Sequence, residues 1–477
     1  MEYDVVIGLE IHCELKTKTK AFCSCKNKFG SMINTNTCPV CMGMPGALPT
    51  INKQAVAFTI KSGLAFNCDI NNIAIFERKN YFYPDLSKAY QISQLEKPIC
   101  ENGKIRYKIN NETKVCRIDN IHMEEDAGKS IHAEELGCSL IDFNRCGVPL
   151  IEIVTKPDIH SADEAVEVLK SIRETLVSIG VSDCKMQEGG LRCDVNISLK
   201  PQGSEVLGIR TEMKNLNSFK AVNRAICYEI ERQTNLLNNG EKIVQETLKW
   251  DDNLGRNFSL RSKETSNDYR YFEDPDLLWL EIPNEYINEI KETIKELPFD
   301  KKNRYSDELK LPNYDIEVLT ASDEISNFFD ECLQYLNKPK VVSNWVMGDI
   351  LRKQKENLNE EIYLPVSAKN FTDLINMVEN KELSINAAKE VFETMWENNK
   401  PAKEIATEKG LLQVNNESEV EGYVDEVISK NPQAVSDYAG GNERTLTFLV
   451  GQVMKLSRGK ANPAIVNKLI KEKLLNK

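Results

Sequence analysis

The sequence predicts an α+β fold, with an antiparallel sheet in the first part of the chain and helical domains after it. Up to about Pro283, β-branched and aromatic residues alternate with polar ones, which is the pattern of half-buried strands. Turn signals such as Asn102-Gly103 separate these segments. From about Glu285 onward, apolar residues recur at the spacing of an amphipathic helix.

This change of pattern divides the chain into three predicted domains. We expect a sheet-based cradle domain over residues 1–293, a helical domain over 294–408 and a small helical tail domain over 409–477. Several prolines between 298 and 401 interrupt the helical pattern of the second domain.

Capping residues and periodicity place the individual helices. One is predicted from Ser161 to about Ile179, with Ser161 as N-cap and Glu164 completing a capping box. A second, from Phe219 to Leu237, is amphipathic with a charged outer face. The same period predicts helices over 324–336, 368–380 and 385–398.

Composition limits the class of protein. Of the 477 residues, 41% are hydrophobic and 28% are charged, as in ordinary soluble proteins. No apolar run approaches the roughly 18 residues that a membrane span needs, and the start, Met1-Glu2-Tyr3-Asp4, lacks a signal-peptide pattern. We therefore expect a cytoplasmic location with reduced thiols, no membrane partner, and, from the net charge of -12, no nonspecific nucleic-acid binding by the whole surface.

Four cysteines form two close pairs near the N-terminus. Cys23 and Cys25 are separated from Cys38 and Cys41 by a polar loop, a spacing that suits a tetrahedral Zn²⁺ site. The alternative is a set of reduced core thiols, but the flanking Lys and Asn residues make this stretch too polar for a core segment. Because four thiolates leave no open coordination position, we predict a structural zinc knuckle over 23–41 and a catalytic centre elsewhere.

Polar residues two positions apart recur in the predicted strands. Residues at this spacing share one face of a strand, so a common sheet would gather carboxylates, amides and imidazoles that suit Mg²⁺ and a nucleotide. The alternative is a set of solvated strand faces, which Lys, Thr and Glu usually fill. The pairs are Glu10 with His12, His122 with Glu124, Asp142 with Asn144, Asp194 with Asn196, and Glu212 with Lys214.

The segment 79–91 surrounds a proline turn with tyrosines, lysines and an acid. Its lysines, Lys79 and Lys88, could hold phosphate oxygens, and a tyrosine could orient a substrate. The alternative is an aromatic surface loop that packs on the sheet.

Several runs together resemble one family. The chain is similar to the B subunit of the tRNA-dependent aspartyl/glutamyl amidotransferase over essentially its whole length. The runs that carry the resemblance are Gly8-Leu9-Glu10-Ile11-His12, 79–91, 122–129, 143–152, 191–196, 212–218, 268–277, 451–455 and 459–463.

The resemblance implies a reaction on a misacylated tRNA that uses ATP and Mg²⁺. The side-chain carboxylate of Glu on tRNA(Gln), or of Asp on tRNA(Asn), is phosphorylated, and ammonia then displaces the phosphate to give the amide. The catalytic domain of the family resembles glutamine synthetase, which agrees with an acidic sheet face.

The resemblance also implies roles for individual residues. Glu10, His12, Glu125 and Glu212 are the expected magnesium ligands and, with Lys79 and Lys88, the expected catalytic residues. Glu124, Asp194 and Lys214 are expected to contact the cofactor, and Tyr81, Tyr83, Asp85 and Asn144 to contact the substrate or to line an ammonia tunnel.

Ammonia must come from another chain, because position 2 is Glu and not a catalytic Cys, and the sequence holds only four His. The resemblance implies a separate glutaminase A subunit and a small C subunit in a heterotrimer. It also assigns tRNA contacts to Lys455, Arg458 and Lys460 in the basic tail, where 440–477 carry six Lys and two Arg against two Glu. The alternative for the tail is the solvated end of an amphipathic helix.

Two other functions remain open at this point. A noncatalytic tRNA-binding scaffold would not need Glu10, His12, Glu125 and Glu212 to converge. A stand-alone ligase for a free amino acid would form the amide without tRNA.

Overall fold

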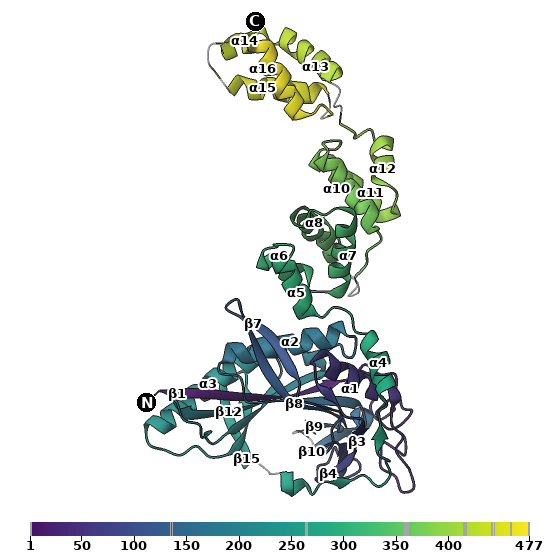
Figure 1. The fold of residues 1–477 in the computed structure, drawn as a ribbon, viewed down its shortest axis with the longest axis vertical. Coiled ribbons are helices and arrows are strands. Elements are labelled where there is room, and N and C mark those ends of the chain that lie inside the picture. Colours follow the sequence, from purple (N-terminus) through teal and green to yellow (C-terminus); the bar gives the residue numbers. More distant parts are fainter. Residues whose placement is uncertain are drawn as a thin grey trace. The chain divides into compact units, whose positions relative to one another are not determined.

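The computed structural model of this protein describes residues 2–133, 135, 137–262, 266–356, 362–413, 417–439, 442, 444–457 and 460–475. They form two compact units, Met1–Lys301 and Lys302–Lys477, each of which is treated by itself (Figure 1). Among the described residues, no helix has both the length and the apolar composition needed to cross a membrane.

The first unit is built on a large sheet that is mainly antiparallel, as predicted. Within the described residues, ten strands take part, in the order β15-β14-β13-β12-β1-β11-β8-β6-β2, with β7 paired to β8 and with β13 parallel to β14. Their bounds are β1 Tyr3–Glu14, β2 Asp69–Ile70, β6 Cys100–Glu101, β7 Lys104–Ile109, β8 Glu112–Glu125, β11 Pro149–Thr155, β12 Leu191–Pro201, β13 Thr211–Leu216, β14 Glu246–Asp251 and β15 Arg256–Ser262.

The central strand β1 alternates between two faces. Leu9, Ile11 and Cys13 are fully buried, whereas Glu10 and His12 point to the other side of the sheet and are half-buried. Each aliphatic side chain buried in this way contributes about 1.5–3 kcal/mol. The alternation leaves one face of the sheet for the core and the other for chemistry.

Three helices cover the apolar face of the sheet (Figure 1). They are α1 (Lys53–Ala65), α2 (Ala162–Ser178) and α3 (Phe219–Asn238). Residues of all three helices belong to the same buried cluster as Leu9 and Ile11. Two further helices, α4 (Asn284–Glu292) and α5 (Pro298–Asp307), follow the last strands.

The helices α2 and α3 each begin at a serine N-cap, of which Ser161 was predicted. Ser161 Oγ accepts a hydrogen bond from the backbone N–H of Glu164, at 3.1 Å, and Ser218 caps α3 in the same way. The capping box predicted for α2 is only half formed. The Glu164 carboxylate accepts from the N–H of His160 and pairs with Lys114, instead of reaching back to the N–H of Ser161.

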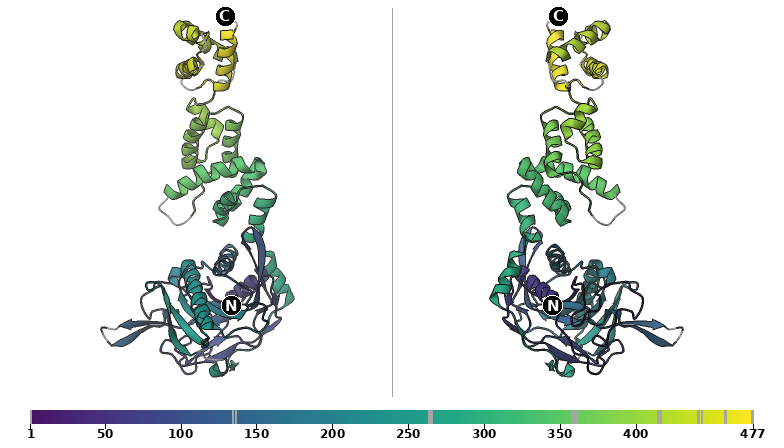
Figure 2. Two further views of the ribbon diagram at one scale, coloured as in Figure 1. Left: turned by 90° about the vertical axis from the view of Figure 1, so that its left-hand side faces the viewer. Right: turned by 90° about the vertical axis from the view of Figure 1, so that its right-hand side faces the viewer.

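Smaller sheets flank the large one. The strands β4 (Glu77–Asn80), β5 (Tyr90–Ser93) and β16 (Phe272–Glu273) form one, and β3 (Ile73–Ala74) pairs with β17 (Leu280–Glu281). A two-stranded ribbon, β9 (Lys129–Ala133) with β10 (Cys138–Asp142), extends away from the large sheet (Figure 2).

The ribbon corrects one of the predicted polar pairs. Asp142 ends β10, and Asn144 lies in the short 3-10 turn Phe143–Arg145, so neither residue belongs to the large sheet. Their side chains instead accept hydrogen bonds from the backbone N–H groups of Asn34 and Asn36. The two-residue spacing of Asp142 and Asn144 therefore belongs to a turn that binds the loop containing Asn34 and Asn36, and not to one face of a strand.

The second unit is helical, as predicted, and contains two separate hydrophobic cores. The helices predicted over 324–336, 368–380 and 385–398 agree with α7, α10 and α11, each of which begins at a serine N-cap. The elements are α6 Asn313–Leu319, α7 Asp323–Tyr335, α8 Pro339–Trp345, the π-helical turn Val346–Ile350, α9 Leu351–Glu356, α10 Ala368–Glu379, α11 Ile385–Asn398, α12 Ala402–Glu408, α13 Glu417–Lys430, α14 Pro432–Ala439, α15 Arg444–Leu456 and α16 Pro463–Leu475.

Candidate active site

Strand register brings polar side chains into rows on the face of the large sheet that α1–α3 leave uncovered. His122 of β8 lies opposite Glu152 of β11, which lies opposite His12 of β1, which in turn lies opposite Arg192 of β12. One step along β1, Glu10 lies opposite Asp194. Because residues two apart share a face, these rows form one continuous polar surface.

His12 lies between two carboxylates. Its Nε2 is 3.4 Å from Glu124 Oε1 and 3.4 Å from Glu152 Oε2. His122 Nε2 is also 3.4 Å from Glu152 Oε2, and its Nδ1 lies 2.8 Å from Asn120 Oδ1. The ligand atoms of His12, Glu124 and Glu152 lie within 4.8 Å of one another, so the three side chains could hold one cation.

Burial and mutual attraction set the charges of this group. Burial alone lowers the pKa of His12, but Glu152 and then Glu124 outweigh it and raise the pKa to about 9. Burial likewise opposes ionisation of Glu152, yet His122 and His12 hold its pKa well below the usual range. The His12 imidazole is therefore held in its protonated form beside the Glu152 carboxylate.

A second group shares His12 with the first. The ligand atoms of Glu10, His12 and Asp194 also lie within 4.8 Å of one another. Lys214 Nζ is 2.5 Å from Asp194 Oδ2 and 3.2 Å from Glu212 Oε1. Burial, with a smaller contribution from Glu152, raises the pKa of Glu10 to about 7.

A cavity of about 520 Å³ opens beside these groups and is lined by Glu10, Glu152, Glu212 and two lysines, Lys79 and Lys214. Its volume lies within the usual range of ligand pockets, roughly 300–1,000 Å³. Val6, Gly8, Leu207 and Thr247 also line it, and Thr247 Oγ1 donates to Glu212 Oε2 at 3.0 Å.

Lys79 brings positive charge to this cavity from β4. Its Nζ lies 5.0 Å from the centroid of the Tyr269 ring. Burial opposes its charge, but Tyr271 and the carboxylates of Glu124 and Glu152 raise its pKa, so the amine is protonated. The cavity thus offers cation ligands and ammonium groups together, a combination suited to a phosphate-bearing ligand.

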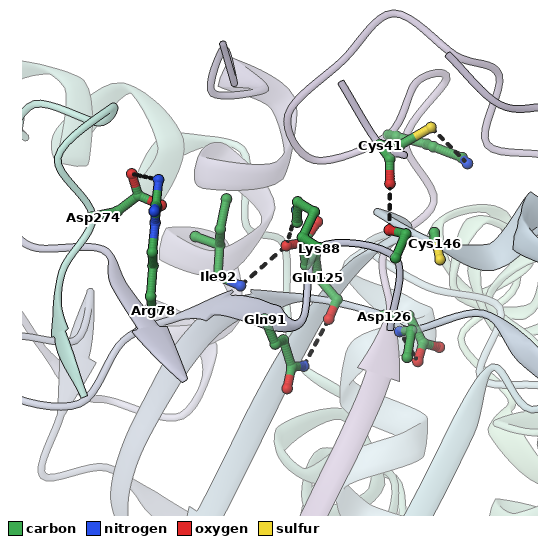
Figure 3. Close-up of polar contacts among 12 residues, drawn as sticks. Cys41, Arg78, Lys88, Gln91, Ile92, Glu125, Asp126, Cys146 and Asp274 are labelled. Carbon is green, nitrogen blue, oxygen red and sulfur yellow. Dashed lines mark hydrogen bonds and ion pairs between the residues drawn. The ribbon is translucent and has the colours of Figure 1, made fainter. Parts of the chain in front are cut away.

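Glu125, predicted as a magnesium ligand with Glu10, His12 and Glu212, belongs to neither group of converging ligand atoms among the described residues, and nor does Glu212. Glu125 follows Glu124 in β8, so its side chain points to the opposite side of the strand. There its carboxylate pairs with Lys88 and accepts from the N–H of Ile92 at 3.0 Å, while its carbonyl accepts from Gln91 Nε2 (Figure 3). The cation groups contain Glu124 and Glu152 in its place.

The remaining residues of the predicted substrate loop have different surroundings. Tyr81 packs edge-on against Tyr269, and its hydroxyl lies 3.5 Å from Gln91 Oε1. Tyr83 is 52% exposed. The backbone carbonyl of Asp85 accepts from the N–H of Gly128.

The four cysteines of the predicted knuckle converge. The Sγ atoms of Cys23, Cys25, Cys38 and Cys41 lie within 4.8 Å of one another. Four sulfurs bound tetrahedrally to zinc at 2.3 Å would be about 3.8 Å apart. The N–H of Cys38 donates to Cys41 Sγ, and the fully buried Lys20 places its Nζ 3.8 Å from the same sulfur. The cluster is compatible with a bound metal.

Of the predicted tRNA contacts, Lys455 and Lys460 are exposed, and Arg458 lies outside the described residues. Other tail lysines are engaged within the unit, since Lys468 pairs with Glu417, and Lys473 with Glu421 and Asp425. Within the described part of the tail, neither Lys455 nor Lys460 forms an ion pair.

Sequence reasoning missed Glu152. It is a lone acid in the otherwise apolar strand Pro149–Thr155, with Ile151 and Ile153 on either side. A carboxylate in a buried strand requires a charged or hydrogen-bonding partner. The single acid in this apolar segment was therefore the sequence feature that could have identified Glu152 as a site residue.

Fold and site together define an α+β protein in which an open sheet face carries two overlapping groups of side chains that could hold a cation, and helical modules follow. The sequence agrees with this definition. Residues 5–288 match the family model of the GatB/GatE catalytic domain, and residues 327–474 match that of the GatB domain.

Relatives are similar over almost the entire chain. The B subunit of the aspartyl/glutamyl-tRNA(Asn/Gln) amidotransferase of Caldicellulosiruptor saccharolyticus is 50% identical over 477 residues, 99% of each chain. The proteins of the same name from Persephonella marina and Clostridium tetani are 48% and 49% identical over 475 residues, covering 99% of this chain and 100% and 99% of the relatives. The chain belongs to the family of these amidotransferase B subunits.

Proposed function

We propose that this protein activates the side-chain carboxylate of a misacylated tRNA with ATP and then forms the amide. The observation that carries the proposal is the convergence of Glu10, His12, Glu124 and Glu152 beside a cavity that holds two protonated lysines. The names of its relatives point to Glu-tRNA(Gln) and Asp-tRNA(Asn) as substrates and to the corresponding amides as products.

Both cation groups fit Mg²⁺, because they supply mainly carboxylate oxygens with one shared imidazole. Bound there, Mg²⁺ would screen the charge that develops on phosphoryl oxygens. His12 must lose its proton to become a ligand, which links cation binding to proton release. Lys79 and Lys214 line the same cavity and would hold the phosphates of ATP as point charges.

The Glu125 side of β8 supports a path for ammonia. Lys88 and Glu125 pair there, and the Tyr81 hydroxyl lies 3.5 Å from Gln91, whose side-chain amide donates to the Glu125 carbonyl. A row of donors and acceptors of this kind can pass a small polar molecule. A glutaminase A subunit would supply the ammonia and a small C subunit would complete the complex, in the cytoplasm.

The other parts then have supporting roles. The four thiols would hold structural Zn²⁺ and fix the loop that follows β1. The antiparallel sheet with an acidic open face supports a glutamine synthetase-like cradle over 1–293, with a helical domain over 294–408. In the tail domain, 409–477, Lys455 and Lys460 would contact tRNA phosphates, with Arg458 beside them in the sequence.

The test is ADP and amide formation by the chain reconstituted with its glutaminase partner. With Mg²⁺, we expect ADP only in the presence of Glu-tRNA(Gln) or Asp-tRNA(Asn), and one amide formed for each ADP when glutamine is added. ADP formed with free glutamate alone would favour a stand-alone ligase. Tight tRNA binding with no ADP in any mixture would favour a noncatalytic scaffold.

A further inference from the structure

Arg192 is a half-buried cation on the polar face that the proposed chemistry has not used. It lies in β12 directly opposite His12. Its Nη2 donates to Asp126 Oδ2 at 2.8 Å, and Asp126 is its one hydrogen-bond partner within the described residues. Its Nε is buried and has no hydrogen-bond partner among the residues that the structure describes. A buried guanidinium N–H without an acceptor lowers the stability of the fold. Such a donor is explained if it binds a ligand.

Holding the neighbouring loop does not require Arg192. Arg145 already donates to the carbonyls of Ala127 and Gly128, and its Nε lies 3.4 Å from the same Asp126 carboxylate. Asp126 therefore faces two guanidinium groups. Glu124 and Glu14 are the other acids close to Arg192. Arg192 is therefore not needed to anchor this loop, and its remaining donors can serve another partner.

The order of residues along β1 indicates which ligand the Arg192 guanidinium faces. Along the polar face of β1, Gly8 lines the cavity, Glu10 and His12 belong to the cation groups, and Glu14 comes last, on the side of Asp126. A phosphoryl group passes in line from its donor to its acceptor. If the nucleotide occupies the cavity, the acceptor enters from the opposite side of the cations, where Arg192 lies.

We propose that Arg192 binds the side-chain carboxylate of the aminoacyl group that is to be activated, through the donors that Asp126 leaves free. This inference rests on the proposed function. Arginine suits a carboxylate because its planar donors match the two oxygens, and Asp126 fixes the guanidinium in place. The neutral amide product cannot form the same charge-assisted bonds, so Arg192 also favours substrate over product.

The experiment measures tRNA-dependent ADP formation by the complete reconstituted complex, with Arg192→Gln and Arg192→Lys. A matched control is Arg117→Gln, since Arg117 lies in the same sheet and pairs with one carboxylate, Asp158, away from the site. We expect Arg192→Gln to raise the KM for Glu-tRNA(Gln) roughly 10- to 100-fold. Arg192→Lys should recover part of the loss, and Arg117→Gln should match the wild type.

Two further readouts separate a carboxylate contact from other roles. The affinity for deacylated tRNA(Gln) and the glutaminase activity should be unchanged in Arg192→Gln. An equal loss of affinity for deacylated tRNA, failure of both Arg192 variants to assemble, or a KM within twofold of the wild type would each overturn the inference. A wild-type complex that makes no ADP with any misacylated tRNA would instead refute the proposed function itself, and this inference with it.

Discussion

Glu124 and Glu125 are consecutive residues of β8, but their carboxylates lie on opposite sides of the strand. Glu124 lies 3.4 Å from the His12 imidazole, beside the cavity, whereas Glu125 pairs with Lys88. The pair therefore allows two functions to be tested by the same substitution at neighbouring positions.

We expect Glu124→Gln to abolish tRNA-dependent ATP hydrolysis, because it removes one charge from a buried cation group. Glu125→Gln should lower ATP hydrolysis much less, and should reduce amide formation from glutamine more than amide formation from added ammonium. Measuring ADP and amide with both nitrogen sources checks this. Equal loss of ATP hydrolysis in the two variants would contradict the separation of the two faces.

The cysteine cluster predicts a bound metal with a structural role. Metal analysis should find about one zinc per chain. Cys41→Ser should lose the metal and lower the melting temperature, while Cys227→Ser, an exposed cysteine outside the cluster, should change neither. Metal content that is unaffected by Cys41→Ser would rule out this site.

Glu14 predicts a dependence of stability on pH. Its pKa is about 7 in the folded protein against 4.5 for the ordinary group, chiefly because of burial. Between these values only the folded state holds the proton, so the contribution of Glu14 to stability is greatest below pH 4.5 and falls as pH rises through 7. Glu14→Gln should therefore gain in melting temperature relative to the wild type between about pH 5 and pH 8. A constant difference across this range would show that Glu14 is ionised throughout.

The tail predicts a salt-dependent interaction with tRNA. The double variant Lys455→Ala/Lys460→Ala should bind tRNA more weakly, and the slope of log affinity against log salt should fall by about one for each phosphate that is no longer neutralised. Lys430→Ala is the control, because Lys430 is exposed in the same unit and already pairs with Glu426. An unchanged slope in the double variant would exclude phosphate binding by these lysines.

Local signals in the sequence predicted several helices and part of the polar face. A serine cap predicted the start of α2, periodicity predicted α3, and the alternation in β1 gave the shared face of Glu10 and His12. These predictions succeed because a cap or a strand face depends on residues only a few positions away.

What local signals did not reveal depended on the relation between segments. The grouping of Glu125 with Glu10 came from the family resemblance, whereas alternation in β8 places Glu124 and Glu125 on opposite sides of the strand. Asp142 and Asn144 had the spacing of a strand pair, but a turn follows Asp142. Glu152 came to light only when register placed it beside two histidines from other strands.

The alternation of β1 makes the core and the polar face interdependent. Inserting one residue in the middle of this strand would exchange Ile11 and Cys13 for Glu10 and His12 along half its length, burying charge among the helices and exposing aliphatic side chains in the cavity. Single substitutions on the polar face can therefore change the chemistry of this chain without disturbing the core. An insertion or deletion in β1 would instead prevent folding, so selection on activity could not act on it.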